Sequence, residues 1–139
     1  TLAGIAFSNA SVALVHGMSR PIGAFYHVPH GLSNAMLLPS VTEFSIPSAT
    51  KRYAECARAM GIALANDNDD LANKKLLIEL SAINEELNVP SPREFGINKD
   101  DFMNNLEIMA EQAIASGSPG NNPRVPSNEE IIDIYKLLW

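Results

Sequence analysis

The sequence predicts an all-α fold, a bundle of about six helices. No segment alternates between apolar and polar residues for long enough to form a good strand, whereas apolar residues recur at helical spacing in the long segments. Proline, glycine and capping residues stand between these segments, where helices begin and end. The chain has 139 residues, of which 46% are hydrophobic, so we expect one core and a single domain over residues 1–139.

The first predicted helix covers about residues 2–19 and is rich in small side chains, which suit a central position in a bundle. Pro21 has no backbone N–H and disfavours helix at the residue before it, so we expect this helix to end near Ser19. Residues 21–29 are expected to be irregular, with at most one short helical turn. A second helix is predicted from His30 to about residue 44.

Two further helices are predicted in the middle of the chain. The third covers about residues 49–60 and ends at Gly61, a usual C-terminal stop. Its predicted buried face consists of Tyr53, Ala57 and Met60. After a polar loop, the fourth helix covers about residues 70–88 and ends before Pro90. Its predicted buried stripe consists of Leu76, Leu80, Ile83 and Leu87.

Capping signals mark the last two predicted helices. Asn98 can cap the fifth, and two aspartates follow in its first turn, where the helix dipole favours negative charge. Its apolar face consists of Phe102, Leu106, Met109 and Ala113. After a loop over residues 116–126, Ser127 and Glu130 have the spacing of a capping box. The last helix is expected to bury Ile131, Ile134, Tyr135 and Leu138.

Composition argues against several classes of partner. The formal net charge is −6 and the chain has no basic run, so we expect no nucleic-acid partner. No apolar run reaches the roughly 20 residues of a bilayer span, and no secretory signal opens the sequence, so we expect no membrane partner. The single cysteine, Cys56, fits a reducing cytoplasm, and its apolar neighbours predict an inert buried thiol.

The start of the sequence is unusual. Thr1 leads directly into an apolar, periodic stretch, whereas complete proteins usually begin with Met and a few polar residues. We therefore expect the sequence to be a piece of a longer protein, cut inside a helix or trimmed of disordered residues.

All three histidines, His16, His27 and His30, lie within one short segment. A loop with proline and glycine separates His16 from His30 and can fold back so that the two imidazoles meet. Neutral imidazole suits iron and zinc better than hard alkaline-earth ions. The chain supplies no H-E-x-x-H motif, no CxxC motif and no obvious acidic third ligand. Spacing alone therefore leaves two alternatives open, a metal pair and structural or surface histidines.

Three strings resemble the signature of iron-containing (group III) alcohol dehydrogenases, the group that includes lactaldehyde reductases and 1,3-propanediol dehydrogenases. They are GIAFSN from Gly4, VHGMSRPIGAFY from Val15 and PHGLSNAMLLP from Pro29. The resemblance continues through Arg52-Tyr53-Ala54 and Asn121-Asn122-Pro123-Arg124 to the closing helix.

This resemblance implies the helical, metal-carrying C-terminal domain of a dehydroquinate synthase-like two-domain enzyme. It implies that His16 and His30 are the last two of four ligands to Fe(II), with Zn(II) possible. An Asp–His pair of ligands and the N-terminal domain that binds most of NAD or NADP are implied to lie upstream of Thr1.

The resemblance also indicates pocket residues. The family usually has a histidine four residues after the first of these ligands, with a proton-relay or nicotinamide-side role, and here that position is Arg20. A guanidinium stays protonated and cannot relay a proton, so Arg20 is expected either to pair with a negative group of the substrate or cofactor or to point away. Phe7 matches a pocket-lining aromatic, and Ser118 lies in the loop that closes over the substrate; core packing and loop capping are the alternatives. His27 matches no ligand and is expected at the pocket rim or surface, or as a substitute relay.

The implied activity is reversible hydride transfer between a small alcohol or aldehyde and NAD or NADP. We expect the full-length protein to be a homo-oligomer, a dimer, and this fragment alone to be inactive and to bind metal weakly. Two other interpretations remain. One keeps the architecture but changes the chemistry, as in zinc-dependent glycerol dehydrogenases or in dehydroquinate synthases, which are lyases. The other is a non-catalytic helical module.

Overall fold

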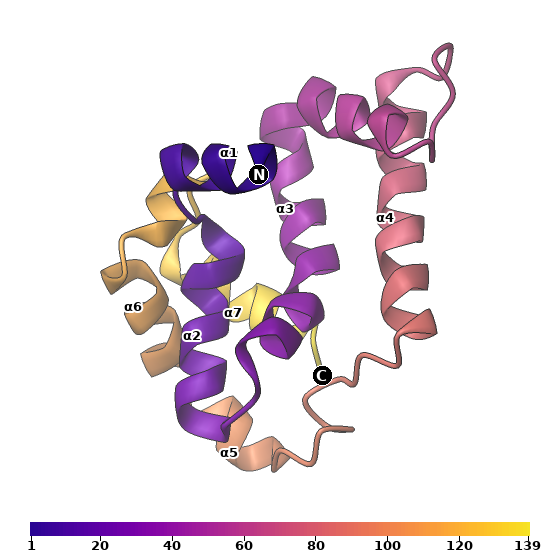
Figure 1. The fold of residues 1–139 in the computed structure, drawn as a ribbon. Helices are drawn as coiled ribbons and strands as arrows, with labels where there is room; N and C mark the ends of the chain where they lie inside the picture. Colours follow the sequence, from indigo (N-terminus) through magenta and orange to yellow (C-terminus); the bar gives the residue numbers. More distant parts are fainter.

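Seven α-helices and one short 3-10 helix make up the computed structural model, which describes all 139 residues and contains no strand (Figure 1). The elements are α1 (Leu2–Ala10), α2 (Leu14–Tyr26), α3 (His30–Ala59), α4 (Asp69–Glu86), α5 (Lys99–Asn104), α6 (Leu106–Ala115), η1 (Ser118–Asn121) and α7 (Asn128–Lys136). The all-α prediction is confirmed, and the fifth predicted helix is divided at Asn105 into α5 and α6.

The main core lies where α2, α6, α7 and the first half of α3 meet. Each of these helices contributes fully buried side chains, as does α5; among them are Leu14, Met18, Ile22, Leu37, Phe102, Met109, Ile131 and Tyr135. The Tyr135 hydroxyl donates a hydrogen bond of 2.7 Å to the carbonyl oxygen of Met18. The capping box at Ser127 and Glu130 is present, so the local signal places α7 as predicted.

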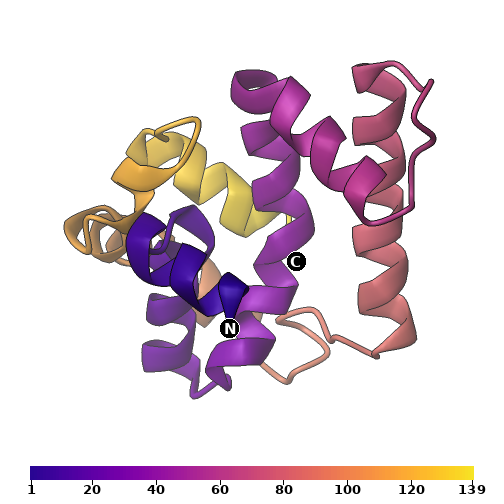
Figure 2. The ribbon, with the colours of Figure 1, turned by 45° about the horizontal axis from the view of Figure 1, so that its top comes forward.

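A second, smaller core joins α4 to the second half of α3, at the edge of the molecule away from α2 (Figures 1 and 2). It consists of Ala54, Ala57, Ala63, Ala72 and Leu76. α3 is kinked at Ala49, where φ is −148° and ψ is 35°. The two helices predicted on either side of Pro47 are therefore present as the two halves of α3, joined across a kink.

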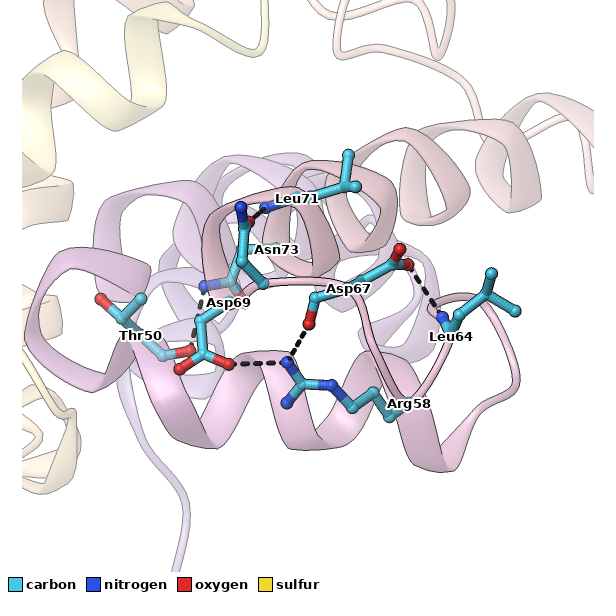
Figure 3. A network of polar contacts seen from close by, with 8 residues as sticks. Thr50, Arg58, Leu64, Asp67, Asp69, Leu71 and Asn73 are labelled. Carbon is cyan, nitrogen blue, oxygen red and sulfur yellow. Dashed lines mark hydrogen bonds and ion pairs between the residues drawn. The ribbon is translucent and has the colours of Figure 1, made fainter.

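A network of polar contacts closes the loop between α3 and α4 (Figure 3). The Nη2 atom of Arg58 donates to the Asp67 carbonyl oxygen at 2.8 Å and to Oδ1 of Asp69 at 2.7 Å. Asn68 caps α4 by accepting from the Leu71 N–H at 2.8 Å, and Asn73 donates to the Thr50 carbonyl oxygen at 2.9 Å. The Asn68 contact satisfies a backbone N–H at the start of α4, and the others join α3 to the loop and to α4.

The predicted first helix begins at the expected residue, but it is broken in the middle and ends later than expected. The chain breaks at Ser11, where φ is 62°, and the axes of α1 and α2 differ by 86°. α2 then continues through Pro21 to Tyr26. A proline inside a helix removes one hydrogen bond, but α2 buries Leu14, Met18 and Ile22 completely, and this packing offsets the loss.

The predicted buried faces of α3 and α4 are only partly right. Leu76 is buried and Leu80 packs against the same core, but Leu87 is 67% exposed. Met60 is 53% exposed, and Cys56 is exposed, so the prediction of a buried thiol is wrong. α4 packs against α3 along its length, with Asn84 near its end donating to the Ala35 carbonyl oxygen at 2.8 Å, but Leu87 lies outside this contact.

No single helix is long and apolar enough to cross a membrane; α1 and α2 meet that test only as a pair, with the bend between them.

Candidate metal centre

The structure places the imidazoles of His16 and His30 beside each other. Their ring centroids are 5.2 Å apart and the ring planes are inclined by 54°. His16 lies in the first turn of α2, and His30 is the first residue of α3. The chain reverses between the two helices at His27, which adopts the left-handed conformation with φ 55°. The loop thus brings together two side chains that come from different helices.

The surroundings of His16 favour its neutral form. Burial lowers the pKa of His16 below its ordinary value of 6.5, and the nearby charges of His30 and Arg20 lower it further. Neutral imidazole is the form that binds a metal ion. Near neutral pH, therefore, His16 has a free lone pair for a metal.

Asn34, one helical turn after His30, holds the second imidazole. Its Nδ2 atom lies 3.2 Å from Nε2 of His30. The two orientations of an amide exchange Oδ1 and Nδ2; with Oδ1 turned toward the ring, Nε2–H of His30 donates to Asn34 and Nδ1 keeps its lone pair for a metal. The Oδ1 atom of Asn34 is buried and has no hydrogen-bond partner. The sequence signal for this contact is the spacing of four residues between His30 and Asn34.

Arg20 and Ser118 meet although they are far apart in the sequence. Arg20 is exposed on α2, one turn after His16, and its Nη1 atom lies 3.5 Å from the Ser118 hydroxyl, at the outer limit of a hydrogen bond. Ser118 is buried at the start of η1. Two of the predicted pocket residues are thus neighbours on the same side of α2.

Phe7 lies next to the histidine pair. Its ring centroid is 6.4 Å from that of His16, and its side chain is 56% exposed. Phe7 and His16 line a mostly apolar cavity of about 610 Å³ between α1, α2 and α3, which Leu38 and Tyr53 also line. Phe7 is therefore a cavity wall and not a core residue.

The remaining histidine stays apart from the pair. His27 is exposed at the C-terminal end of α2, and no hydrogen bond or ring contact joins it to His16 or His30. No group of three or more His, Cys, Asp or Glu side chains could hold a metal ion. The chain thus offers two convergent imidazole donors, which suit iron or zinc, but not a full set of ligands.

Comparison with known proteins places this geometry in a family. The family model for the C-terminal part of Fe-containing alcohol dehydrogenases matches residues 1–139. The chain belongs to the iron-containing alcohol dehydrogenase family. The resemblance carried by the three sequence strings is thereby confirmed, and so is the assignment to the C-terminal domain.

Several relatives of this iron-containing alcohol dehydrogenase domain match almost its whole length. It is 34% identical over 139 residues to the NADPH-dependent butanol dehydrogenase of Clostridium saccharobutylicum and to the lactaldehyde reductase of Escherichia coli (strain K12). Each alignment covers 99% of this chain and 35% of the relative, so the chain spans about a third of the length of these curated relatives.

Solved structures show the same fold. A 1,3-propanediol oxidoreductase superimposes with a TM-score of 0.90 at 29% identity, and an alcohol dehydrogenase from Oenococcus oeni with a TM-score of 0.88 at 31% identity. In both cases the match covers 99% of this chain and 35% of the other. This helical fold is therefore shared with known alcohol dehydrogenases.

Proposed function

We propose that this chain is the metal-binding part of an NAD(P)-dependent, iron-dependent alcohol dehydrogenase that transfers hydride reversibly between an alcohol and nicotinamide. The observation that carries the proposal is the convergence of His16 and His30, at 5.2 Å between ring centroids, in a chain of this family. The butanol dehydrogenase and the lactaldehyde reductase are named for small substrates, and we propose a small alcohol or aldehyde here as well.

His16 and His30 would hold the metal, Fe(II) or alternatively Zn(II). When bound, the metal would supply Lewis-acid polarisation of the substrate oxygen. Three residues of this chain would prepare the site for the metal. His16 stays neutral because of its surroundings, Asn34 orients the ring of His30, and Phe7 contributes an apolar wall that excludes water.

The other ligands and most of the site for NAD or NADP would come from residues that this chain does not contain, since it spans 35% of its relatives. We therefore propose that the chain alone is inactive and binds metal weakly, because two ligands give up most of the affinity of a complete site. We also propose that the complete protein is a cytoplasmic homodimer.

The test uses the complete protein, with metal content and NAD(P)H-dependent reduction of aldehydes measured side by side. His16→Ala and His30→Ala should each lose the metal and the activity, whereas His27→Ala should retain both. His27 is the matched control, because it lies in the same segment but is not in contact with the pair. Retention of metal and activity in the first two variants would make these histidines structural and would refute the proposal.

A further inference from the structure

The distribution of acidic residues in this chain is uneven. The chain carries a net charge of −6 from 16 acidic and 10 basic residues, yet residues 1–42 and 112–128 contain no Asp or Glu. These two segments form α1, α2, the first part of α3 and η1, the elements around the histidine pair. The neighbourhood of the candidate site therefore lacks carboxylates of its own in an otherwise acidic chain.

Arg20 is the cation at this place, and no carboxylate neutralises it. The four ion pairs of the structure engage Arg58, Lys75, Arg124 and Lys136. The guanidinium of Arg20 has one polar partner, the Ser118 hydroxyl at 3.5 Å. A guanidinium has five N–H donors, so most of the donors of Arg20 remain available to a ligand.

The position of Arg20 suits a ligand that also reaches the histidine pair. Arg20 follows His16 by one helical turn, so both side chains lie on the same side of α2. The guanidinium reaches the Ser118 hydroxyl, and Ser118 is itself buried and donates its N–H to the Ser116 hydroxyl at 3.3 Å. The planar fork of a guanidinium matches the two oxygens of a carboxylate with parallel N–H donors.

We propose that Arg20 binds a carboxylate of the substrate, so that the enzyme prefers aldehydes and alcohols that carry an acid group. The inference rests on the proposed dehydrogenase function. In the reaction, an oxo acid would accept a hydride from NAD(P)H at its carbonyl carbon and a proton at its carbonyl oxygen. The products are the hydroxy acid and NAD(P)⁺, and the carboxylate that Arg20 holds is unchanged.

The phosphate groups of the cofactor have the same anionic chemistry, so the experiment must separate the two sources. The complete, metal-loaded enzyme is assayed with succinic semialdehyde and with its neutral methyl ester, each varied at saturating cofactor. The cofactor is then varied at saturating aldehyde. The variants are Arg20→Gln, which removes the charge, and Arg20→Lys, which keeps the charge but not the fork of donors. Arg93→Gln is the control, because Arg93 is exposed and in no ion pair.

The wild type should have the higher kcat/KM for the semialdehyde. Arg20→Gln should raise the KM for the semialdehyde by about tenfold or more, since hydrogen bonds to charged groups are among the strong ones, and should change the KM for the ester by less than about twofold. The KM of Arg20→Lys for the semialdehyde should lie between the values of the wild type and of Arg20→Gln. Arg93→Gln should have the wild-type KM for both aldehydes.

Three results would overturn the inference and leave the proposed function intact. The wild type could prefer the ester, Arg20→Gln could affect both aldehydes equally, or the KM of the cofactor alone could rise, which would make the cofactor the anion. Failure of the wild type to reduce any aldehyde would instead refute the proposed function, and the inference with it.

Discussion

Gly17 on α2 lies directly against the ring of Pro119 on η1. A Cβ atom at Gly17 would stand 2.9 Å from Cδ and 3.0 Å from Cγ of Pro119, which is closer than real Cβ contacts come. Gly17 follows His16 in the sequence, and Pro119 follows Ser118. The close approach of backbone to ring therefore sets the distance between the helix that carries His16 and Arg20 and the loop that carries Ser118.

Gly17→Ala should destabilise the protein by about 1–3 kcal/mol, the usual cost of overpacking, because the proline ring has little freedom to move aside. Gly31→Ala is the matched control. Gly31 also lies in a helix but a Cβ there meets nothing within 4 Å, so its free energy of unfolding should stay the same or rise by less than about 1 kcal/mol. Urea unfolding of the metal-free complete protein measures both, and equal midpoints would show that η1 adjusts freely.

Tyr135 should contribute to stability through a single buried hydrogen bond. Its hydroxyl donates to the Met18 carbonyl oxygen at 2.7 Å, and burial raises the pKa of Tyr135 well above its ordinary value of 10.0. Tyr135→Phe should lower the free energy of unfolding by about 1 kcal/mol. Tyr26→Phe is the comparison, because the Tyr26 hydroxyl is near solvent and water can replace its partners. An equal loss in the two variants would contradict the importance of burial.

Local signals in the sequence predicted local structure well. Asn98 caps α5 and Ser127 caps α7, because a capping contact involves residues only three apart. Where the sequence-based predictions were wrong, tertiary packing determined the structure. Pro21 lies inside a helix because α2 is buried against three neighbours, and Leu87 is 67% exposed although it continues the apolar stripe of α4. Neither fact is encoded in the periodicity of a single segment.

The candidate site was predictable to a similar extent. The spacing of His16 and His30 allowed their meeting, and the resemblance to a family gave them a role. The contact of Arg20 with Ser118 spans 98 positions in the sequence. It depends on how η1 docks on α2, which local patterns do not determine. Asn34 could have been found, since its distance of four residues from His30 is the spacing of neighbours on a helix.

Asn34→Ala should weaken metal binding about 10–100-fold, the usual effect of removing a partner that orients a metal-ligating histidine. The amide of Asn34 limits the rotation of the His30 ring, and without it the ring must be ordered when the metal binds. Competition with a chelator in the complete protein measures the affinity. The control is Asn104→Ala, because Asn104 is exposed and makes no side-chain hydrogen bond. An unchanged affinity in Asn34→Ala would mean that the ring is held by other contacts.

The lowered pKa of His16 should make the free energy of unfolding depend on pH in the acid range. In the metal-free complete protein, His16 should titrate below its ordinary value of 6.5 because of burial first, then the charges of His30 and Arg20. The unfolded chain accepts this proton more readily than the folded one. The stabilisation is therefore fully present above the unfolded-state pKa and is lost as the pH falls through the folded-state pKa.

Arg20→Gln removes one of the three causes, so it should raise the pKa of His16 and reduce the stability that is lost in acid, whereas Arg93→Gln should change neither. Proton NMR of the imidazole, with His16→Gln to assign the resonance, measures the pKa. Because Arg20 repels a metal cation at this imidazole as it repels a proton, metal loading should be stronger in Arg20→Gln than in the wild type. An unchanged pKa in Arg20→Gln would place the guanidinium too far from the ring to act on it, and would separate Arg20 from the metal centre.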